Sequence, residues 1–194
     1  VYKRQHHWVF RDLKFASGGI SSANIFAFSD PNYGVVAGAG GTLWCTFYDT
    51  NILGGADYGV QFKNTVNSFK FYNLTSGYNK VYELYIQGGR HTFVGTSLQN
   101  SASAGAGTFV QCEGSASFYN LECESSGASV QYGFTVNTDQ TIVVNHCMFS
   151  GVVVRDFAIT SSYATTANLM VTPSYAMSVA GARNVTVYGS QPMV

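Results

Sequence analysis

Apolar and polar residues alternate in short runs along most of this chain. The clearest runs are WVFRDLKF, NSFKFYN, KVYELYIQ, TIVVNHCMF and NVTVYGS, and no segment sustains the apolar period of a helix. Strict alternation places apolar side chains on one side of an extended backbone, so these runs predict β-strands. The pattern therefore predicts an all-β fold.

Two of the predicted strands nearly repeat each other. SFKFYNLTSG (68–77) and SASFYNLECESSG (115–127) share the sequence Phe-Tyr-Asn-Leu, in which Asn73 and Asn120 are 47 residues apart. This distance is too long for a hairpin and too short for a duplicated domain. It suggests two turns of a structural repeat whose period is about half as long.

A column of residue pairs extends this repeat through the chain. Each pair has an aromatic or β-branched residue followed two places later by Asp, Asn or Gly, which most readily adopt a left-handed backbone or close a turn. The pairs are Phe10/Asp12, Phe28/Asp30, Phe47/Asp49, Phe71/Asn73, Phe93/Gly95, Phe118/Asn120, Val143/Asn145, Thr166/Asn168 and Val187/Gly189. The mean step of about 22 residues predicts about nine coils, each stacked on the next around a continuous core.

The period and the turn chemistry resemble those of the right-handed parallel β-helix of the pectate-lyase-like superfamily, in which Asn side chains often stack at such a bend. The resemblance covers roughly residues 9–190 and includes no catalytic motif. It implies a single-stranded right-handed parallel β-helix, with about nine rungs of about 22 residues stacked about 4.8 Å apart. We expect one domain over residues 1–194, and the absence of an initiator Met suggests a processed chain or a fragment of a longer one.

Composition narrows the classes of function. Only 10% of the residues are charged, 15% are aromatic and 21 are glycine, whereas an ordinary soluble domain is about 25% charged. The formal net charge is zero, and the one concentration of basic residues lies near the N-terminus. These residues are too few for a nucleic-acid-binding surface. No apolar stretch approaches the roughly 18 residues of a membrane-spanning helix. We therefore expect neither nucleic-acid binding nor membrane insertion.

Low charge, abundant Ser, Gly and Thr, and irregular rungs also resemble bacteriophage tailspikes and tail fibres. This resemblance implies a protein of the virion tail, or an extracellular one, that binds bacterial surface polysaccharide as a homotrimer beside other tail proteins. Whether it also cleaves the polysaccharide is left open. Two alternatives remain: a stand-alone polysaccharide lyase or glycoside hydrolase of the same fold, and an adhesin or structural solenoid without an active site.

Candidate catalytic residues come from positions that share one offset in successive rungs. At a nearly constant interval after four successive column members, the chain holds His91, Glu113, Asp139 and Tyr163. On one edge, two carboxylates would suit glycoside hydrolysis, and His or Tyr could donate a proton. Arg90 could stabilise developing negative charge. The alternative is that Glu113 and Asp139 simply occupy solvated turns.

Two further groups of residues have both a functional and an ordinary explanation. Glu122 and Glu124 alternate with Leu121 and Cys123, so both carboxylates should point outward, as catalytic groups or as a solvated strand face. The densest tyrosine patch is Tyr82 and Tyr85 around Glu83. Tyrosine can stack on a sugar ring or pack at a damp surface.

The cysteines and acidic residues give no metal signature. Cys45, Cys112, Cys123 and Cys147 lack C-x-x-C spacing, which leaves buried thiols or a Cys123–Cys147 disulfide. The ten acidic residues are too scattered to suggest a calcium site, so no metal or cofactor is expected. Asn73-Leu-Thr75 matches the glycosylation pattern, but its place in the Asn column predicts a buried, unmodified side chain.

Overall fold

A computed structural model describes residues 7–16, 26–28, 44–53, 58–62, 68–79, 81–100, 107–125, 130–138, 141–151, 155–159, 168–173, 179–180 and 185–187. All regular elements in these residues are β-strands, so this part of the chain offers no helix that could cross a membrane. The strands are β1 (His7–Arg11), β2 (Lys14–Ala16), β3 (Phe26–Phe28), β4 (Trp44–Leu53), β5 (Tyr58–Phe62), β6 (Phe69–Gly77), β7 (Tyr82–Ile86), β8 (Arg90–Asn100), β9 (Gly107–Cys112), β10 (Ser115–Ser125), β11 (Val130–Val136), β12 (Thr141–Ser150), β13 (Arg155–Ile159), β14 (Asn168–Pro173), β15 (Val179–Ala180) and β16 (Val185–Val187).

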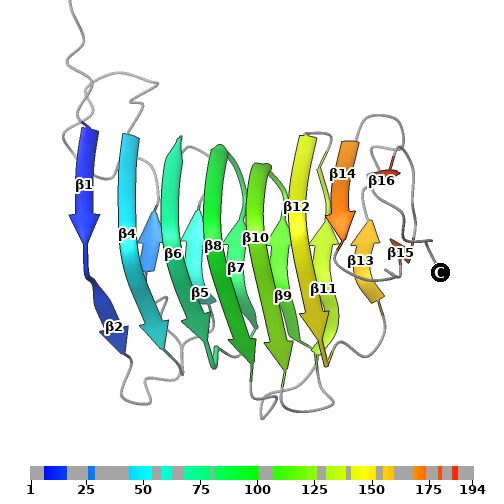
Figure 1. The fold of residues 1–194 in the computed structure, drawn as a ribbon, viewed down its shortest axis with the longest axis horizontal. Coiled ribbons are helices and arrows are strands. Elements are labelled where there is room, and N and C mark those ends of the chain that lie inside the picture. Colours follow the sequence, from blue (N-terminus) through cyan, green and yellow to red (C-terminus); the bar gives the residue numbers. More distant parts are fainter. Residues whose placement is uncertain are drawn as a thin grey trace, which may run out of the picture.

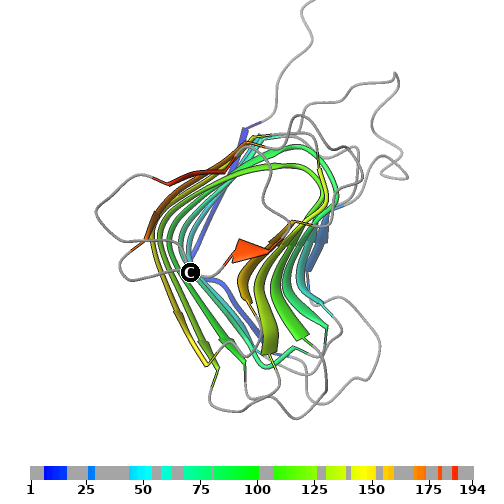
Figure 2. The ribbon, with the colours of Figure 1, turned by 90° about the vertical axis from the view of Figure 1, so that its right-hand side faces the viewer.

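The strands form two parallel sheets (Figure 1). The long sheet has the order β1-β4-β6-β8-β10-β12-β14-β16, with β2 also paired to β4, and the short sheet has the order β15-β13-β11-β9-β7-β5-β3. From β3 onward, successive strands alternate between the sheets, and every pair is parallel. The chain thus coils around an enclosed core (Figure 2), which confirms the predicted all-β parallel solenoid.

A ladder of phenylalanine rings runs along the inside of the long sheet. Phe10, Phe47, Phe71, Phe93 and Phe118 are aligned on neighbouring strands. Successive ring centroids lie 4.6–5.5 Å apart, with interplanar angles of 6–14°. Because parallel in-register pairing repeats the same position at every strand, identical aromatic side chains stack directly. The predicted column is confirmed at these five positions.

The predicted left-handed corner follows this ladder two residues later. Asp12, Asp49, Asn73, Gly95 and Asn120 have φ values of 52–65°, a conformation that Asp, Asn and Gly tolerate best. The Nδ2 of Asn73 donates a hydrogen bond to Asp49 Oδ1 over 2.9 Å, from one coil to the next. Asn73 is exposed, so the prediction that it is buried is wrong, because the corner turns these short side chains towards solvent.

One predicted pair belongs to the other sheet. Phe28 is aligned with Phe62 in the short sheet, so Phe28 is not a member of the column and Phe47 directly follows Phe10. Alternation around Phe28 predicts a strand but does not say which sheet that strand joins. Asp30, its predicted corner partner, lies outside the described residues.

The column is shifted by one residue in β12. Phe118 is aligned with Val144 and not with the predicted Val143. The left-handed residue is His146, with φ of 53°, instead of the predicted Asn145. The run Ile-Val-Val is apolar on both parities, so the sequence alone did not fix which face is buried.

Farther along the chain, Val144 is aligned with Val171 and Val171 with Val187. Val187 is therefore confirmed, whereas Val171 takes the place predicted for Thr166. Asn168 begins β14 and is aligned with Thr141. Thr166 and Gly189 lie outside the described residues.

Coil length varies along the column. The interval from Phe71 to Phe93 is shorter than the interval from Phe47 to Phe71 before it and the interval from Phe93 to Phe118 after it. The predicted number of rungs and their predicted common length are not established by the described residues.

The four cysteines are buried thiols in the core. Cys123 is aligned with Phe149, and Cys147 with Leu121, so the two thiols do not oppose each other directly. The interpretation as buried thiols is confirmed. They act as small apolar groups, as buried cysteine commonly does.

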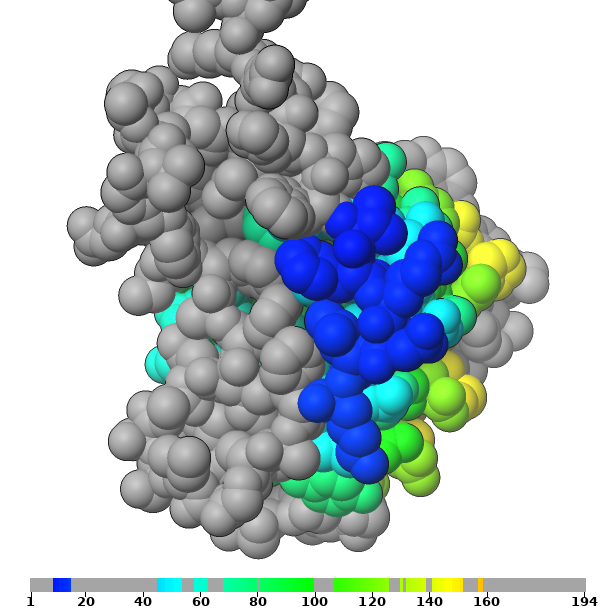
Figure 3. Space-filling model, turned by 90° about the vertical axis from the view of Figure 1, so that its left-hand side faces the viewer, coloured from blue at the N-terminus to red at the C-terminus, as the bar shows by residue number. Residues whose placement is uncertain are grey.

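Strand β1 forms one edge of the long sheet (Figure 3). Phe10 stacks on Phe47 but is still 36% exposed, and Val9 is 51% exposed. The phenylalanine ladder is thus covered less completely at this edge than in its middle.

Candidate functional site

A local break in strand alternation brings two tyrosines to one surface of the short sheet. In β7, Tyr82 and Tyr85 are half-buried, whereas Glu83 and Leu84 between them are both buried. Two successive inward residues shift the alternation, so residues three apart face the same way. The neighbouring strands also depart from simple alternation, because four successive residues are buried in β5 (59–62) and four in β9 (107–110).

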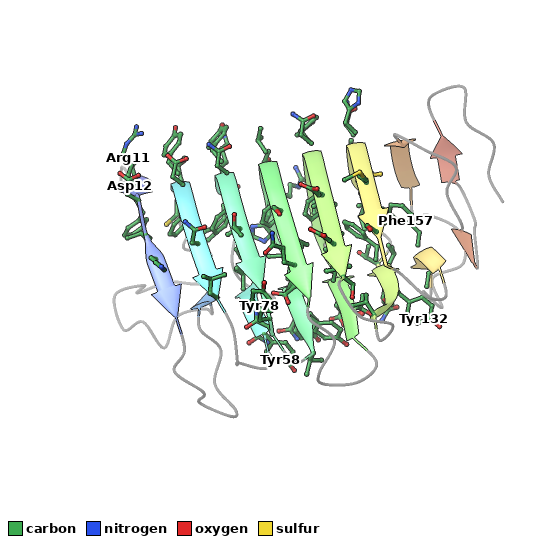
Figure 4. All side chains as sticks on the ribbon, turned by 60° about the horizontal axis from the view of Figure 1, so that its bottom comes forward. Arg11, Asp12, Tyr58, Tyr78, Tyr132 and Phe157 are labelled. Carbon is green, nitrogen blue, oxygen red and sulfur yellow. The ribbon has the colours of Figure 1, made fainter. Side chains whose placement is uncertain are left out.

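Three tyrosine rings gather on this outer surface. Tyr58 is aligned with Tyr82, and their centroids lie 5.7 Å apart at an interplanar angle of 15°. Tyr85 lies 5.4 Å from Tyr58 and 5.2 Å from Tyr82, with tilts of 43° and 50°. Tyr85 is therefore not stacked face to face on either neighbour, and its side chain is partly exposed. Tyr132 continues the row of Tyr58 and Tyr82 beyond Thr108 (Figure 4).

Polar side chains form a connected network beside the rings. Gln61 Nε2 donates to Gln87 Oε1 over 3.1 Å, and Gln87 Nε2 donates to the Tyr85 hydroxyl over 3.2 Å. The Tyr85 hydroxyl donates to Glu113 Oε1 over 3.2 Å, and Gln111 Nε2 donates to the same oxygen over 3.4 Å. This network holds the Glu113 carboxylate against the tyrosines.

We call this surface the tyrosine face. It consists of Tyr58, Gln61, Tyr82, Tyr85, Gln87, Gln111 and Glu113, on β5, β7 and β9 and the turns after β7 and β9.

Both phenols next to Glu113 keep their protons at neutral pH. Burial, and secondarily the charge of Glu113, raise the pKa of Tyr85 to about 12. Burial, and then Tyr58 and Glu113, also raise the pKa of Tyr82. Tyr85 is therefore a hydrogen-bond donor to Glu113. Only Oε1 of Glu113 accepts these bonds, so Oε2 can accept a hydrogen bond from a ligand hydroxyl.

Glu83 lies beneath the tyrosine face. Its Oε1 accepts a hydrogen bond from the Asn79 backbone N–H over 3.0 Å, and its Oε2 accepts from Ser76 Oγ over 2.9 Å and from Asn79 Nδ2. Burial raises its pKa to about 7, against the opposing effect of these hydrogen bonds. The predicted substrate contact is therefore a buried anchor that ties the turn after β6 to β7.

The anchor requires a glycine in the neighbouring strand. A Cβ on Gly59 would lie 2.2 Å from Ser76 Oγ, 2.6 Å from the Glu83 carbonyl oxygen and 2.8 Å from Asn79 Nδ2. Since none of these separations is sterically possible, residue 59 leaves space for the Ser76–Asn79–Glu83 cluster.

His91 lies in the core. Its ring stacks on Phe62 with a centroid separation of 4.1 Å, and its side chain is only 2% exposed. The Phe69 backbone N–H donates to Nδ1 over 3.4 Å, so Nε2 carries the proton and donates to Gly88 O over 2.7 Å. Burial lowers the His91 pKa to about 4. The neutral imidazole thus packs and hydrogen-bonds inside the solenoid.

Glu122 and Glu124 lie on the long sheet. Both are exposed, while Leu121 and Cys123 are buried, so the predicted alternation is confirmed. Glu122 is aligned with Ser97 and Met148, and Glu124 with Gln99 and Ser150. Neither carboxylate belongs to the tyrosine face.

The remaining predicted residues divide between the described and undescribed parts. Arg90 is exposed at the start of β8, where it is aligned with Ser115. Asp139 and Tyr163 lie outside the described residues. Where the structure describes the chain, it contains no cluster of three His, Cys, Asp or Glu residues that could hold a metal ion.

Sequence reasoning missed Tyr58 and the three glutamines. The signal was present in three short strands, YGVQF (58–62), YELYI (82–86) and TFVQC (108–112), which the structure aligns position by position. Glutamine or tyrosine occupies the fourth place in each, and this repeated polar position within an apolar strand marks the side on which the hydrogen-bonded network forms.

Comparisons of this chain with protein-family models, with curated proteins and with solved structures found no match.

Proposed function

We propose that this chain is a glycan-binding solenoid of the bacteriophage tailspike or tail-fibre kind, which binds bacterial surface polysaccharide through the tyrosine face. In this proposal it is a right-handed β-helix of the pectate-lyase-like type, with about nine rungs of about 22 residues. It acts as a homotrimer, beside other tail proteins in the virion or outside the cell. The observation that carries the proposal is the outward Tyr58–Tyr82–Tyr85 cluster, joined by hydrogen bonds to Glu113.

The chemistry of the face suits a sugar chain. A tilted tyrosine offers an apolar surface to the C–H side of a sugar ring, and its hydroxyl supplies a polar contact at the edge. Glutamine amides both donate and accept hydrogen bonds, and a carboxylate accepts them from hydroxyls. Alternating apolar and polar contacts of this kind match a molecule that is itself apolar on one side and hydroxyl-rich at its rim.

Electrostatics favour a neutral glycan. Among the seven residues of the tyrosine face, Glu113 is the one with an acidic side chain. Its charge contributes to the raised pKa of Tyr82 and Tyr85. An acidic sugar placed beside it would meet a like charge in a partly desolvated setting, which is unfavourable. A neutral, hydroxyl-rich polysaccharide avoids that repulsion.

Cleavage of the polysaccharide is a separate extension of this proposal. Most glycoside hydrolases need two carboxyl groups on either side of the scissile bond. Glu113 supplies one, and Asp139 is the second candidate from the sequence, with His91 accounted for by its place in the core. The geometry of the described residues supports binding more directly than it supports hydrolysis or a lyase reaction.

A binding panel tests the proposal. The purified chain is applied to an array of bacterial capsular and O-antigen polysaccharides, beside a Tyr82→Ala/Tyr85→Ala variant and a Tyr119→Ala control on the long sheet. We expect the original chain and the control to bind a neutral polysaccharide and the double variant to lose that binding. Equal binding by all three proteins, or none by the original chain, would overturn the assignment.

Two further measurements separate the alternatives. Shorter oligosaccharides after incubation, seen by size-exclusion chromatography, would indicate a depolymerase. Light scattering distinguishes a trimer from the monomer expected of an adhesin-type solenoid.

A further inference from the structure

Tyr78 has an unusual backbone for its residue type. Its φ is 66°, in the left-handed region where a bulky L-residue is strained. At the corner of the long sheet this conformation belongs to Asp, Asn, Gly and His146, and Ser68 is also small and polar. Tyr78 is thus the one large aromatic residue in this conformation within the part of the chain that the structure describes.

The backbone around Tyr78 is held from both sides. The Tyr78 N–H donates to Gln99 O over 2.9 Å. On the other side, Asn79 donates from its backbone N–H to Glu83 and from Nδ2 to Gly77 O over 3.3 Å. Glu83 is buried and accepts three hydrogen bonds from this turn. The neighbours therefore impose the strained conformation.

Burial of the Tyr78 ring does little to compensate for the strained backbone. It is 49% exposed, so burial does not offset the unfavourable backbone. Glycine or asparagine would meet the same backbone requirement with less strain. Strain that the surroundings enforce around an exposed side chain is characteristic of binding sites.

The turn also lies next to the tyrosine face. Ser76 and Asn79 pack against Gly59 and Glu83, the residues that immediately follow Tyr58 and Tyr82. Figure 4 shows Tyr78 and Tyr58 towards the same end of the strands. Tyr78 is therefore placed at the rim of the face, on the turn that leads into β7.

We propose that Tyr78 is a further glycan-binding residue, which extends the tyrosine face beyond the start of β7 and stacks on the sugar unit next to the Tyr58–Tyr82–Tyr85 cluster. This inference rests on the proposed function of that face. The Ser76–Asn79–Glu83 cluster is the positioning device: its hydrogen bonds fix the turn, so that the ring is held towards solvent before any ligand arrives. Such preorganisation reduces the entropy lost on binding.

The test replaces Tyr78 by asparagine, which accepts the left-handed backbone but removes the ring. Tyr78→Asn and Tyr78→Phe are compared with the original chain and with Tyr119→Ala, a control tyrosine of similar exposure (39%) on the long sheet. The probe is the neutral polysaccharide that gives the strongest signal on the array. Affinity is measured by titration and folding by thermal unfolding.

We expect Tyr78→Asn to bind roughly fivefold more weakly, as loss of one aromatic contact implies, while its melting temperature stays the same or rises. Tyr78→Phe should keep most of the affinity, and Tyr119→Ala should keep all of it. Unchanged affinity of Tyr78→Asn would overturn the inference and leave the tyrosine face intact. A clear fall in its melting temperature would also overturn it, because the ring would then serve the fold. If the original chain binds no polysaccharide, the proposed function fails as well.

Discussion

Two surfaces of this solenoid carry clustered tyrosines, and they differ in how the rings are arranged. On the long sheet, Tyr48 and Tyr72 stack at 4.9 Å with an interplanar angle of 10°, and the Arg11 guanidinium lies 4.2 Å over the Tyr48 ring. Both faces of Tyr48 are therefore covered by its own protein. On the tyrosine face, Tyr85 is tilted by 43° and 50° against its neighbours, so its ring is not stacked face to face on either of them.

The difference comes from strand alternation. Arg11, Tyr48 and Tyr72 occupy one aligned position on regular parallel strands, so their side chains repeat at the strand spacing and stack on each other. On the short sheet, the paired inward residues Glu83 and Leu84 bring Tyr85 beside a row to which it does not belong by alternation. Regular pairing thus favours a stacked ladder, and interrupted alternation favours a cluster of tilted rings.

The largest effect should come from filling the space that permits this interruption. Gly59→Ala would drive a Cβ into Ser76, Asn79 and the Glu83 backbone, and we expect a loss of about 3 kcal/mol of stability from overpacking. Denaturant unfolding measures it. Gly77→Ala is the matched control, because its nearest contact would be 3.1 Å from Gln99 O. Similar losses in the two variants would contradict the special role of residue 59.

The pH dependence of stability offers a second test, because burial raises the pKa of one group and lowers the pKa of another. The Glu83 pKa is raised from 4.5 to about 7, so the native state binds more protons and stability falls as pH rises through this window. The His91 pKa is lowered from 6.5 to about 4, so the unfolded state binds more protons and stability rises with pH there. Each effect is about 3 kcal/mol, and the two oppose each other where the windows overlap.

Removing one of the two titrating groups should reveal the pH effect of the other. In Glu83→Gln only the His91 effect remains, so this variant should lose about 3 kcal/mol as pH falls from 6.5 to about 4, while the original chain stays nearly level over most of that range. Urea unfolding at several pH values measures both proteins. Parallel pH profiles would show that Glu83 does not titrate as its burial implies.

One substitution on each tyrosine surface tests the comparison directly. Tyr48→Ala should cost about 1 kcal/mol of stability, because it removes a stacked ring and the cation–π contact of Arg11, and should leave glycan binding unchanged. Tyr82→Ala should weaken binding about tenfold, with a smaller effect on stability. Unfolding curves and polysaccharide titrations on both variants would show the crossed pattern. If both variants lose binding equally, the two surfaces are not functionally distinct.

The smallest effect should come from the hydroxyl of Tyr85. Tyr85→Phe removes the hydrogen bond to Glu113 but keeps the ring, so we expect a loss of about 1 kcal/mol or less in binding free energy. Tyr72→Phe on the long sheet is the control and should change nothing. A complete loss of binding in Tyr85→Phe would mean that the hydroxyl, and not the ring, dominates recognition.

The sequence by itself determined the parallel solenoid and most of its corner. Alternation identified strands, and the recurrence of an aromatic residue two places before Asp, Asn or Gly located Phe47, Phe71, Phe93 and Phe118 in one ladder. This succeeds because parallel stacking repeats one environment at every coil, so a local steric requirement becomes a visible period. Where the run was apolar on both faces, as at Val143 and Val144, the register depended on packing and the sequence did not fix it.

Only the tertiary structure decided which polar residues meet. By sequence, Glu83 stood between Tyr82 and Tyr85 as one patch, and His91 shared an offset with Glu113. In the structure Glu83 and His91 are buried away from this network, while Gln61, itself buried, joins the partly exposed Gln87, Gln111, Tyr85 and Glu113 through hydrogen bonds. Glu83 is buried in space that Gly59 leaves in the adjacent coil. Contacts between coils depend on packing between residues far apart in the chain, and local alternation does not predict them.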